Sequence, residues 1–152
     1  MKYLLDNNVL SEFSKPRRDP DVIRWVQAQQ PDDLCTSVIV IGEIRFGIER
    51  MVFSRRRTEL DVWLRRELPG LIRGGILPVD EVVAERYGRV RAKHARQGHL
   101  RGELDTWIIA TAQVYGLAVA TRNFHDFGGL GVGIVNPWDL EGVKDMPGTD
   151  RW

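Results

Sequence analysis

The sequence predicts an α/β protein in which a central, mostly parallel sheet of about five strands lies between helices in a three-layer α/β/α arrangement. Short apolar runs alternate with segments in which apolar residues recur every three or four positions, and these two patterns are typical of buried strands and amphipathic helices. The strand candidates are residues 3–5, 34–36, 76–79, 117–120 and 132–135. Because each strand is followed by a helical segment, crossover connections and parallel pairing are expected.

Capping residues support the helices between these strands. Asp19-Pro20 is typical of a helix start, because aspartate accepts from free backbone amides and proline suits the first turn. Ser37 and Asp80 stand at equivalent positions before two further segments, and Gly116 is expected to end the last helix. The predicted helices cover residues 20–30, 38 to at least 48, 58–68, 81 toward a loop at 98–102, and 103–115.

The composition fits one globular domain. The chain has 152 residues, of which 43% are hydrophobic and 28% charged, and no apolar run approaches the roughly 20 residues that span a bilayer. The first residues lack the length and cleavage site of a signal peptide, so a cytoplasmic protein without membrane contact is expected. Cys35 is the single cysteine and is expected in the core, which leaves only His94, His99 and His125 as soft ligands and disfavours a zinc cluster.

The net charge of +1 gives no global attraction for nucleic acid. Basic residues nevertheless gather in two segments, Arg55, Arg56, Arg57, Arg65 and Arg66 in the first and Arg86, Arg89, Arg91, Lys93, Arg96 and Arg101 in the second. These segments are either solvated helix faces or contacts for a polyanion.

Three carboxylates, Asp6, Glu43 and Asp105, stand where apolar stretches give way to a turn or helix. A carboxylate beside an apolar core is costly unless it is paired, protonated or bound to a cation. In a parallel sheet, ligands collect beyond the carboxyl ends of the strands, where Asp6 follows the first strand and Thr121 the fourth. We therefore expect these residues to meet at one edge of the sheet, together with Asn123 and Asp126.

Oxygen ligands without nearby histidine or thiolate select Mg²⁺ or Mn²⁺ over zinc. Such ions commonly act on phosphate esters, so hydrolysis of a phosphodiester by metal-activated water is the favoured chemistry. Taken singly, each carboxylate has another reading, because Asp6 and Asp105 suit turn and helix caps and Glu43 suits a salt bridge. The sequence contains no glycine-rich phosphate loop and no Gly-x-Ser-x-Gly motif.

Five stretches in a fixed order resemble the PIN-domain ribonucleases, specifically the VapC-type toxins of toxin-antitoxin pairs. They are residues 4–12, 37–48, 104–112, 120–127 and 136–138. The resemblance implies a PIN-like three-layer domain over residues 1–140. Residues 141–152 are rich in Asp, Gly and Pro, and this composition predicts a weakly ordered tail. It also implies that Asp6, Glu43 and Asp105 bind metal and catalyse RNA hydrolysis, with Asn8 and Thr121 in support.

Two positions depart from the family pattern. Asn7 stands where the family usually has threonine, and Asn123 stands where many members carry a fourth acidic residue. An amide oxygen can coordinate a hard cation but brings no charge, so a second ion is expected to bind weakly at Asn123 or with help from Asp126.

The resemblance further implies a homodimer and a VapB-like antitoxin, which would occupy the active-site groove and bind operator DNA through its other half. Candidate contact residues are Trp25, Phe46, Phe53 and Trp63, each of which also suits a core position. An alternative is a weakly catalytic subunit that represses transcription together with its antitoxin. A structure-specific DNA nuclease is a third reading, disfavoured because the chain has no insertion to form a threading arch.

Overall fold

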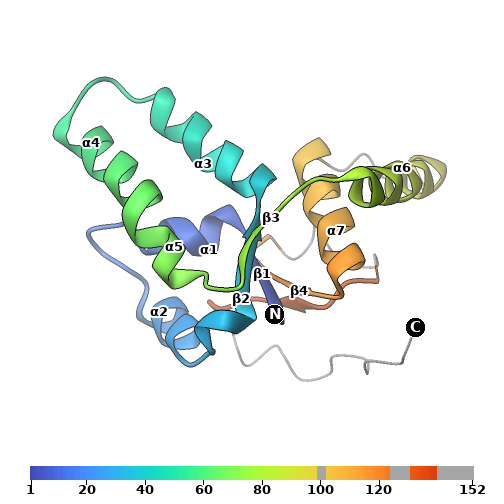
Figure 1. Cartoon of the computed structure of the whole chain (residues 1–152), viewed down its shortest axis with the longest axis horizontal. Coiled ribbons are helices and arrows are strands. Elements are labelled where there is room, and N and C mark those ends of the chain that lie inside the picture. Colours follow the sequence, from blue (N-terminus) through green and yellow to red (C-terminus); the bar gives the residue numbers. More distant parts are fainter. Residues whose placement is uncertain (99–101, 124–130, 140–152) are drawn as a thin grey trace.

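The computed structural model describes residues 1–98, 102–123 and 131–139, and these residues form one five-stranded sheet flanked by helices (Figure 1). The strands are β1 (Tyr3–Leu5), β2 (Leu34–Ser37), β3 (Gly75–Leu77), β4 (Ala118–Ala120) and β5 (Ile134–Val135). They pair in the order β3-β2-β1-β4-β5, and every pairing is parallel. The predicted fold class is confirmed.

The helices cover both faces of the sheet, and Figure 1 shows α1, α2, α4 and α5 on one side of the strands and α6 and α7 on the other. Their bounds are α1 (Asn7–Glu12), α2 (Pro20–Gln27), α3 (Val38–Glu49), α4 (Arg55–Val62), α5 (Leu68–Leu71), α6 (Glu81–Arg96) and α7 (Glu103–Tyr115). A 3₁₀ turn (Pro31–Asp33) precedes β2, and a π-helix (Trp63–Glu67) joins α4 to α5. The chain adds β2 and β3 on one side of β1 and then crosses to add β4 and β5 on the other side, which accounts for the two helical layers.

The core extends over both faces of the sheet and includes residues of its central strand and of α7. Leu4 and Leu5 of β1 and Ile108 and Ile109 of α7 have no solvent exposure. Asp19, Ser37 and Asp80 cap helices as expected, and α7 ends at Gly116, whose φ of 66° is the left-handed conformation that glycine adopts without strain. Local capping signals therefore place the helices that frame the sheet.

Several boundaries differ from the prediction. The helix expected over 58–68 begins at Arg55, because the Ser54 side chain accepts from the Arg57 amide and so caps an earlier turn. The helix expected to reach Gln30 ends at Gln27, and the short α1 was not predicted because six residues carry too little periodicity. The third strand stops at Leu77, since Pro78 cannot donate to the sheet.

No helix among residues 1–98, 102–123 and 131–139 is long and apolar enough to cross a bilayer. Cys35 is a buried free thiol in β2, as expected for a core residue. The tail predicted at 141–152 lies outside the described residues, as do His99, His125 and Asp126.

Candidate active site

The parallel pairing of β1 with β4 brings together two chain segments that are far apart in the sequence. Leu5 lies in register with Ala120, and the Asp6 amide donates to the Ala120 carbonyl at 3.0 Å. The next residue of each strand, Asp6 and Thr121, therefore emerges side by side at the carboxyl edge of the sheet. This is the edge at which parallel sheets collect their ligands.

Asp6 is held in place by three donors. Its carboxylate is 5% exposed and accepts from the Asn7 amide at 2.7 Å, from Asn8 Nδ2 at 2.9 Å and from the Thr121 hydroxyl at 2.7 Å. Burial raises the pKa of Asp6 above its ordinary value, and the three hydrogen bonds oppose that effect. The side chain also caps α1, so its orientation is fixed by the backbone that follows it.

Asn8 and Thr121 link the two strand ends. Asn8 Nδ2 also donates to the Thr121 hydroxyl oxygen at 3.1 Å, and Asn8 Oδ1 accepts from the Arg122 amide at 3.2 Å. The Thr121 oxygen accepts in addition from the Asn123 amide at 3.0 Å. The Asn123 side chain is exposed beside this network, whereas Asp126 is not among the described residues.

Glu43 approaches the same centre from α3, which contacts both α1 and α7. Burial, and then the charges of Asp6 and Asp105, raise the pKa of Glu43 from 4.5 to about 7. Its Oε2 atom is buried and has no hydrogen-bond partner among the described residues. Glu43 is therefore a partly buried carboxylate, and no described residue forms an ion pair that compensates its charge.

Asp105 lies in the first turn of α7, where its carboxylate folds back toward Gly102. A Cβ atom added to Gly102 would stand 2.7 Å from Asp105 Oδ2, which is closer than real Cβ contacts. Gly102 therefore leaves the space that the carboxylate occupies. The helix start is also fastened by the Thr106 hydroxyl, which donates to the Gly102 carbonyl at 3.0 Å.

The three carboxylates do not form a ready-made metal cage. Within the described part of the chain, no three His, Cys, Asp or Glu side chains stand close enough to hold one ion. Mg²⁺ usually keeps several waters and binds through one or two carboxylates, so a cage is not required. The uncompensated Glu43 oxygen and the oxygen-only donor set fit a hydrated hard cation.

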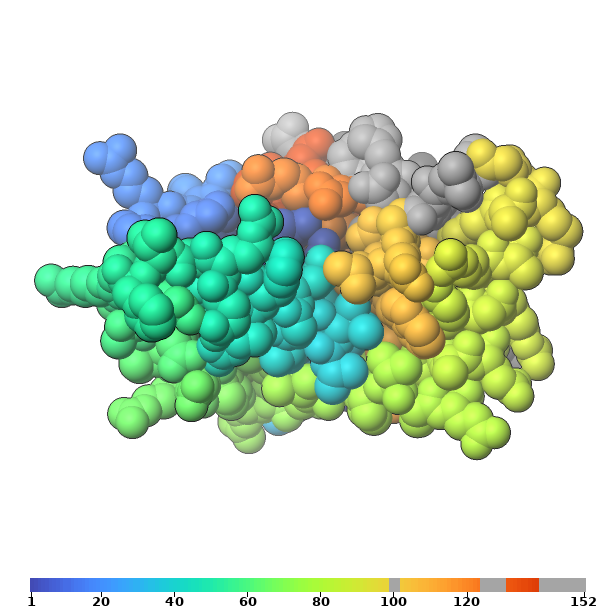
Figure 2. Space-filling model, turned by 90° about the horizontal axis from the view of Figure 1, so that it is seen from above, coloured from blue at the N-terminus to red at the C-terminus, as the bar shows by residue number. Residues whose placement is uncertain are grey.

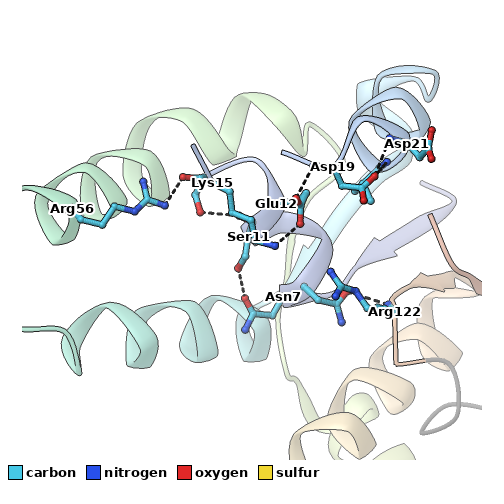
Figure 3. Close-up of polar contacts among 11 residues, drawn as sticks. Asn7, Ser11, Glu12, Lys15, Asp19, Asp21, Arg56 and Arg122 are labelled. Carbon is cyan, nitrogen blue, oxygen red and sulfur yellow. Dashed lines mark hydrogen bonds and ion pairs between the residues drawn. The ribbon is translucent and has the colours of Figure 1, made fainter. Parts of the chain in front are cut away.

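A second set of polar residues lies on α1 and in the loop that follows it (Figure 3), and sequence reasoning missed it. Glu12 of α1 is 2% exposed, and its carboxylate accepts from the Asp19 amide at 2.7 Å and from Lys15 Nζ at 2.6 Å. Ser11 donates to Asn7 Oδ1 at 2.7 Å. Glu12 therefore closes the loop after α1, and only recognition of that short helix would have singled it out.

The four aromatic residues considered as contact residues divide into two pairs. Trp25 and Trp63 are buried at 9% and 5% exposure and belong to the core, so a surface role for them is wrong. Phe46 and Phe53 are exposed at 63% and 93%. Arg50 and Arg57 lie over their rings, with the guanidinium carbon 5.4 Å and 4.4 Å from the respective ring centroid.

Comparison with known proteins identifies the family to which the chain belongs. A family model described as the PIN domain matches residues 3–127, and the chain belongs to the PIN-domain family. The sequence is 36% identical to VapC ribonuclease Y4jK of Sinorhizobium fredii over 90% of this chain and 97% of that protein. It is 33% identical to toxin FitB of Neisseria gonorrhoeae over 89% and 97%.

Solved structures give the same assignment. The chain matches the crystal structure of FitAcB from Neisseria gonorrhoeae with a TM-score of 0.83 and 33% identity, over 91% of this chain and 99% of that one. It matches DNA-bound VapBC from Salmonella typhimurium with a TM-score of 0.72 and 26% identity, over 90% and 98%. The resemblance to VapC-type PIN proteins that the sequence indicated is confirmed.

Proposed function

We propose that the protein is an endoribonuclease toxin that hydrolyses RNA phosphodiester bonds with Mg²⁺ or Mn²⁺ and is inhibited by a VapB-like antitoxin. The observation that carries the proposal is the group of Asp6, Glu43 and Asp105, in which burial and mutual repulsion raise the Glu43 pKa to about 7. Relatives named as ribonucleases support the choice of RNA.

In this proposal Asp6 and Asp105 hold the main ion, and Asn123 or Asp126 assists a second one. A divalent cation bound there would supply an activated water and charge neutralisation at the scissile phosphate. Asn8 and Thr121 hold the Asp6 carboxylate in a fixed position in which it would bind the ion, because both donate to Asp6 Oδ2.

Glu43 is proposed to orient the attacking water and to accept its proton. A carboxylate whose pKa lies near neutrality is suited to this step, because it is partly ionised at the working pH yet basic enough to take a proton. Its buried Oε2 has no competing donor within the described residues. The proton then resides on Glu43 until solvent removes it.

The toxin is proposed to act as a homodimer in the cytoplasm and to reach operator DNA only through the antitoxin complex. Complexes of FitAB and VapBC bound to DNA support that partnership. The exposed Phe46 and Phe53 remain candidates for the antitoxin contact. Replacing both with serine is expected to weaken inhibition by the antitoxin while leaving RNA cleavage intact.

The test is cleavage of total cellular RNA and of a tRNA pool by the purified chain in Mg²⁺, Mn²⁺ or EDTA, beside Asp6→Asn and Asp105→Asn. Discrete products that require the metal and disappear in both variants are expected. Direct Mg²⁺ binding by calorimetry, weakened in both variants, is the second readout. A folded, metal-binding chain that cleaves neither RNA would instead favour the transcriptional-repressor alternative.

A further inference from the structure

The proposed nuclease centre is acidic, which raises the question of where its RNA substrate gains affinity. Asp6, Glu43 and Asp105 repel a phosphate backbone until a cation is bound, and the net charge of the chain is only +1. Affinity for RNA comes mainly from lysine and arginine that neutralise phosphates. The side chains that bind the RNA backbone are therefore expected among the exposed lysines and arginines that have no acidic partner.

The arginines of α4 and the π-helix are largely engaged within the protein. Arg55 pairs with Glu59 at 2.8 Å, Arg57 with Glu49 at 2.5 Å, and Arg65 with Asp61 at 3.2 Å. Arg56 donates to the Ser14 carbonyl at 2.5 Å. The contacts of Arg56 and Arg57 fasten α4 to its neighbours, and an arginine that already faces a carboxylate offers little net charge to RNA.

The cations of α6 differ in both spacing and pairing. Arg86, Arg89, Lys93 and Arg96 follow one another at intervals of three, four and three residues, which places them along one face of the helix. This basic stripe extends over about 15 Å at the helical rise. Arg86, Lys93 and Arg96 have no ion pair among the described residues, and Arg89 meets Glu85 only at 3.4 Å in an exposed pair.

The orientation of the basic stripe is fixed by the other faces of α6. Val83 and Val90 are buried, and the Tyr87 ring stacks on Trp107 of α7 with centroids 3.7 Å apart and planes 8° from parallel. Arg91, which lies off the stripe, pairs with Glu103 at 3.1 Å. The stripe is therefore held on a helix that is packed against α7.

α6 packs against α7, whose first turn carries Asp105, so the stripe lies on the helix next to the one that bears that carboxylate. Figures 1 and 2 show α6 at one end of the molecule and α4 at the other, so the two basic segments do not form one surface.

We propose that the basic stripe of α6 binds the phosphate backbone of the RNA substrate beside the carboxylate centre; this inference rests on the proposed ribonuclease function. Neighbouring cations on a helix face are about 5–6 Å apart, which suits a linear polyanion. Apart from Val82 the row is charged, and lysine and arginine are the side chains that neutralise phosphates, so the surface fits an RNA backbone.

The test uses a triple variant, Arg86→Gln, Lys93→Gln and Arg96→Gln, since glutamine preserves helix propensity. The matched control, Arg17→Gln, Arg18→Gln and Arg66→Gln, removes the same charge from exposed arginines away from α6. The value of kcat/KM is measured on a tRNA pool with Mg²⁺ over a series of KCl concentrations. A fluorogenic RNA dinucleotide, which has a single phosphate, serves as a substrate too short to need the stripe.

The α6 triple variant is expected to lose about 100-fold in kcat/KM on tRNA at about 0.1 M salt, and its logarithmic salt slope is expected to flatten by about 2. Dinucleotide turnover should stay at the wild-type level, and Arg86→Lys with Arg96→Lys should keep the wild-type slope.

Equal losses in the α6 variant and in the control would overturn the stripe proposal, and so would a wild-type slope in the α6 variant. If the wild-type protein cleaves neither tRNA nor the dinucleotide with Mg²⁺ or Mn²⁺, the ribonuclease function itself fails and the stripe proposal falls with it. The two failures are therefore distinguishable in one set of assays.

Discussion

Replacing Glu43 by glutamine is expected to stabilise the metal-free protein while abolishing RNA cleavage. The carboxyl has a folded pKa of about 7 against an ordinary 4.5, so the folded state binds the proton more tightly than the unfolded state. The free energy of unfolding therefore falls as the pH rises from about 4.5 to about 7. Glutamine keeps the shape of the side chain and removes the titration.

The size of this effect follows from the shift. At 1.36 kcal/mol per pKa unit, the full shift corresponds to an upper limit of about 3 kcal/mol. Because the side chain is partly solvated, we expect about 1 to 2 kcal/mol, which raises the melting temperature by roughly 3–6 °C for a chain of this size.

The assay is thermal unfolding of wild type and Glu43→Gln in EDTA at pH 5 and pH 8, with exposed Glu81→Gln as the control. The two proteins should melt alike at pH 5, where Glu43 is protonated, and should diverge at pH 8. Adding Mg²⁺ should raise the melting temperature of the wild type more than that of Glu43→Gln, because binding to the folded state alone stabilises it. A Glu43→Gln protein that melts at or below the wild-type temperature at pH 8 would refute the reasoning.

Three further substitutions test the surroundings of the site. Thr121→Val should leave Asp6 Oδ2 without its hydroxyl donor, destabilise the fold by about 1 to 2 kcal/mol in chemical denaturation and weaken Mg²⁺ binding; unchanged binding would contradict this. Gly102→Ala should displace the Asp105 carboxylate, so calorimetric Mg²⁺ affinity should fall with little loss of stability. Glu12→Ala should cost about 1 to 3 kcal/mol, because the partly buried Asp19 amide loses its acceptor, and limited proteolysis should then cut the loop after α1; a resistant loop would argue against this role of Glu12.

The parallel sheet and the order of strands and helices along the chain could be predicted. Short apolar runs and helix caps such as Ser37 and Asp80 are local signals that can be read from the sequence. The short α1 could not be predicted, because a helix of six residues, Asn7–Glu12, is too short to show a helical period. The π-helix at Trp63–Glu67 lies where a regular helix was predicted. Nothing local in the sequence marks such a change of backbone pitch.

Some features of the site could likewise be predicted from the sequence, and others could not. Asp6, Asn8 and Thr121 follow apolar strands, so their approach could be predicted from the rule that parallel strands end at one edge. The closeness of Gly102 to Asp105 depends on side-chain geometry and had no sequence signal beyond a loop glycine. Which arginines form ion pairs with carboxylates could likewise be seen only in the folded structure.

The hydrogen bond between Thr121 and Asp6 joins residues 115 positions apart, and this separation has a consequence for biosynthesis. Asp6 is among the first residues to be synthesised, but β4 and Thr121 are synthesised only after Asp105. Closing such a distant contact is a late event in folding. An incomplete nascent chain therefore lacks this contact, and the proposed centre can assemble only after most of the chain has been synthesised.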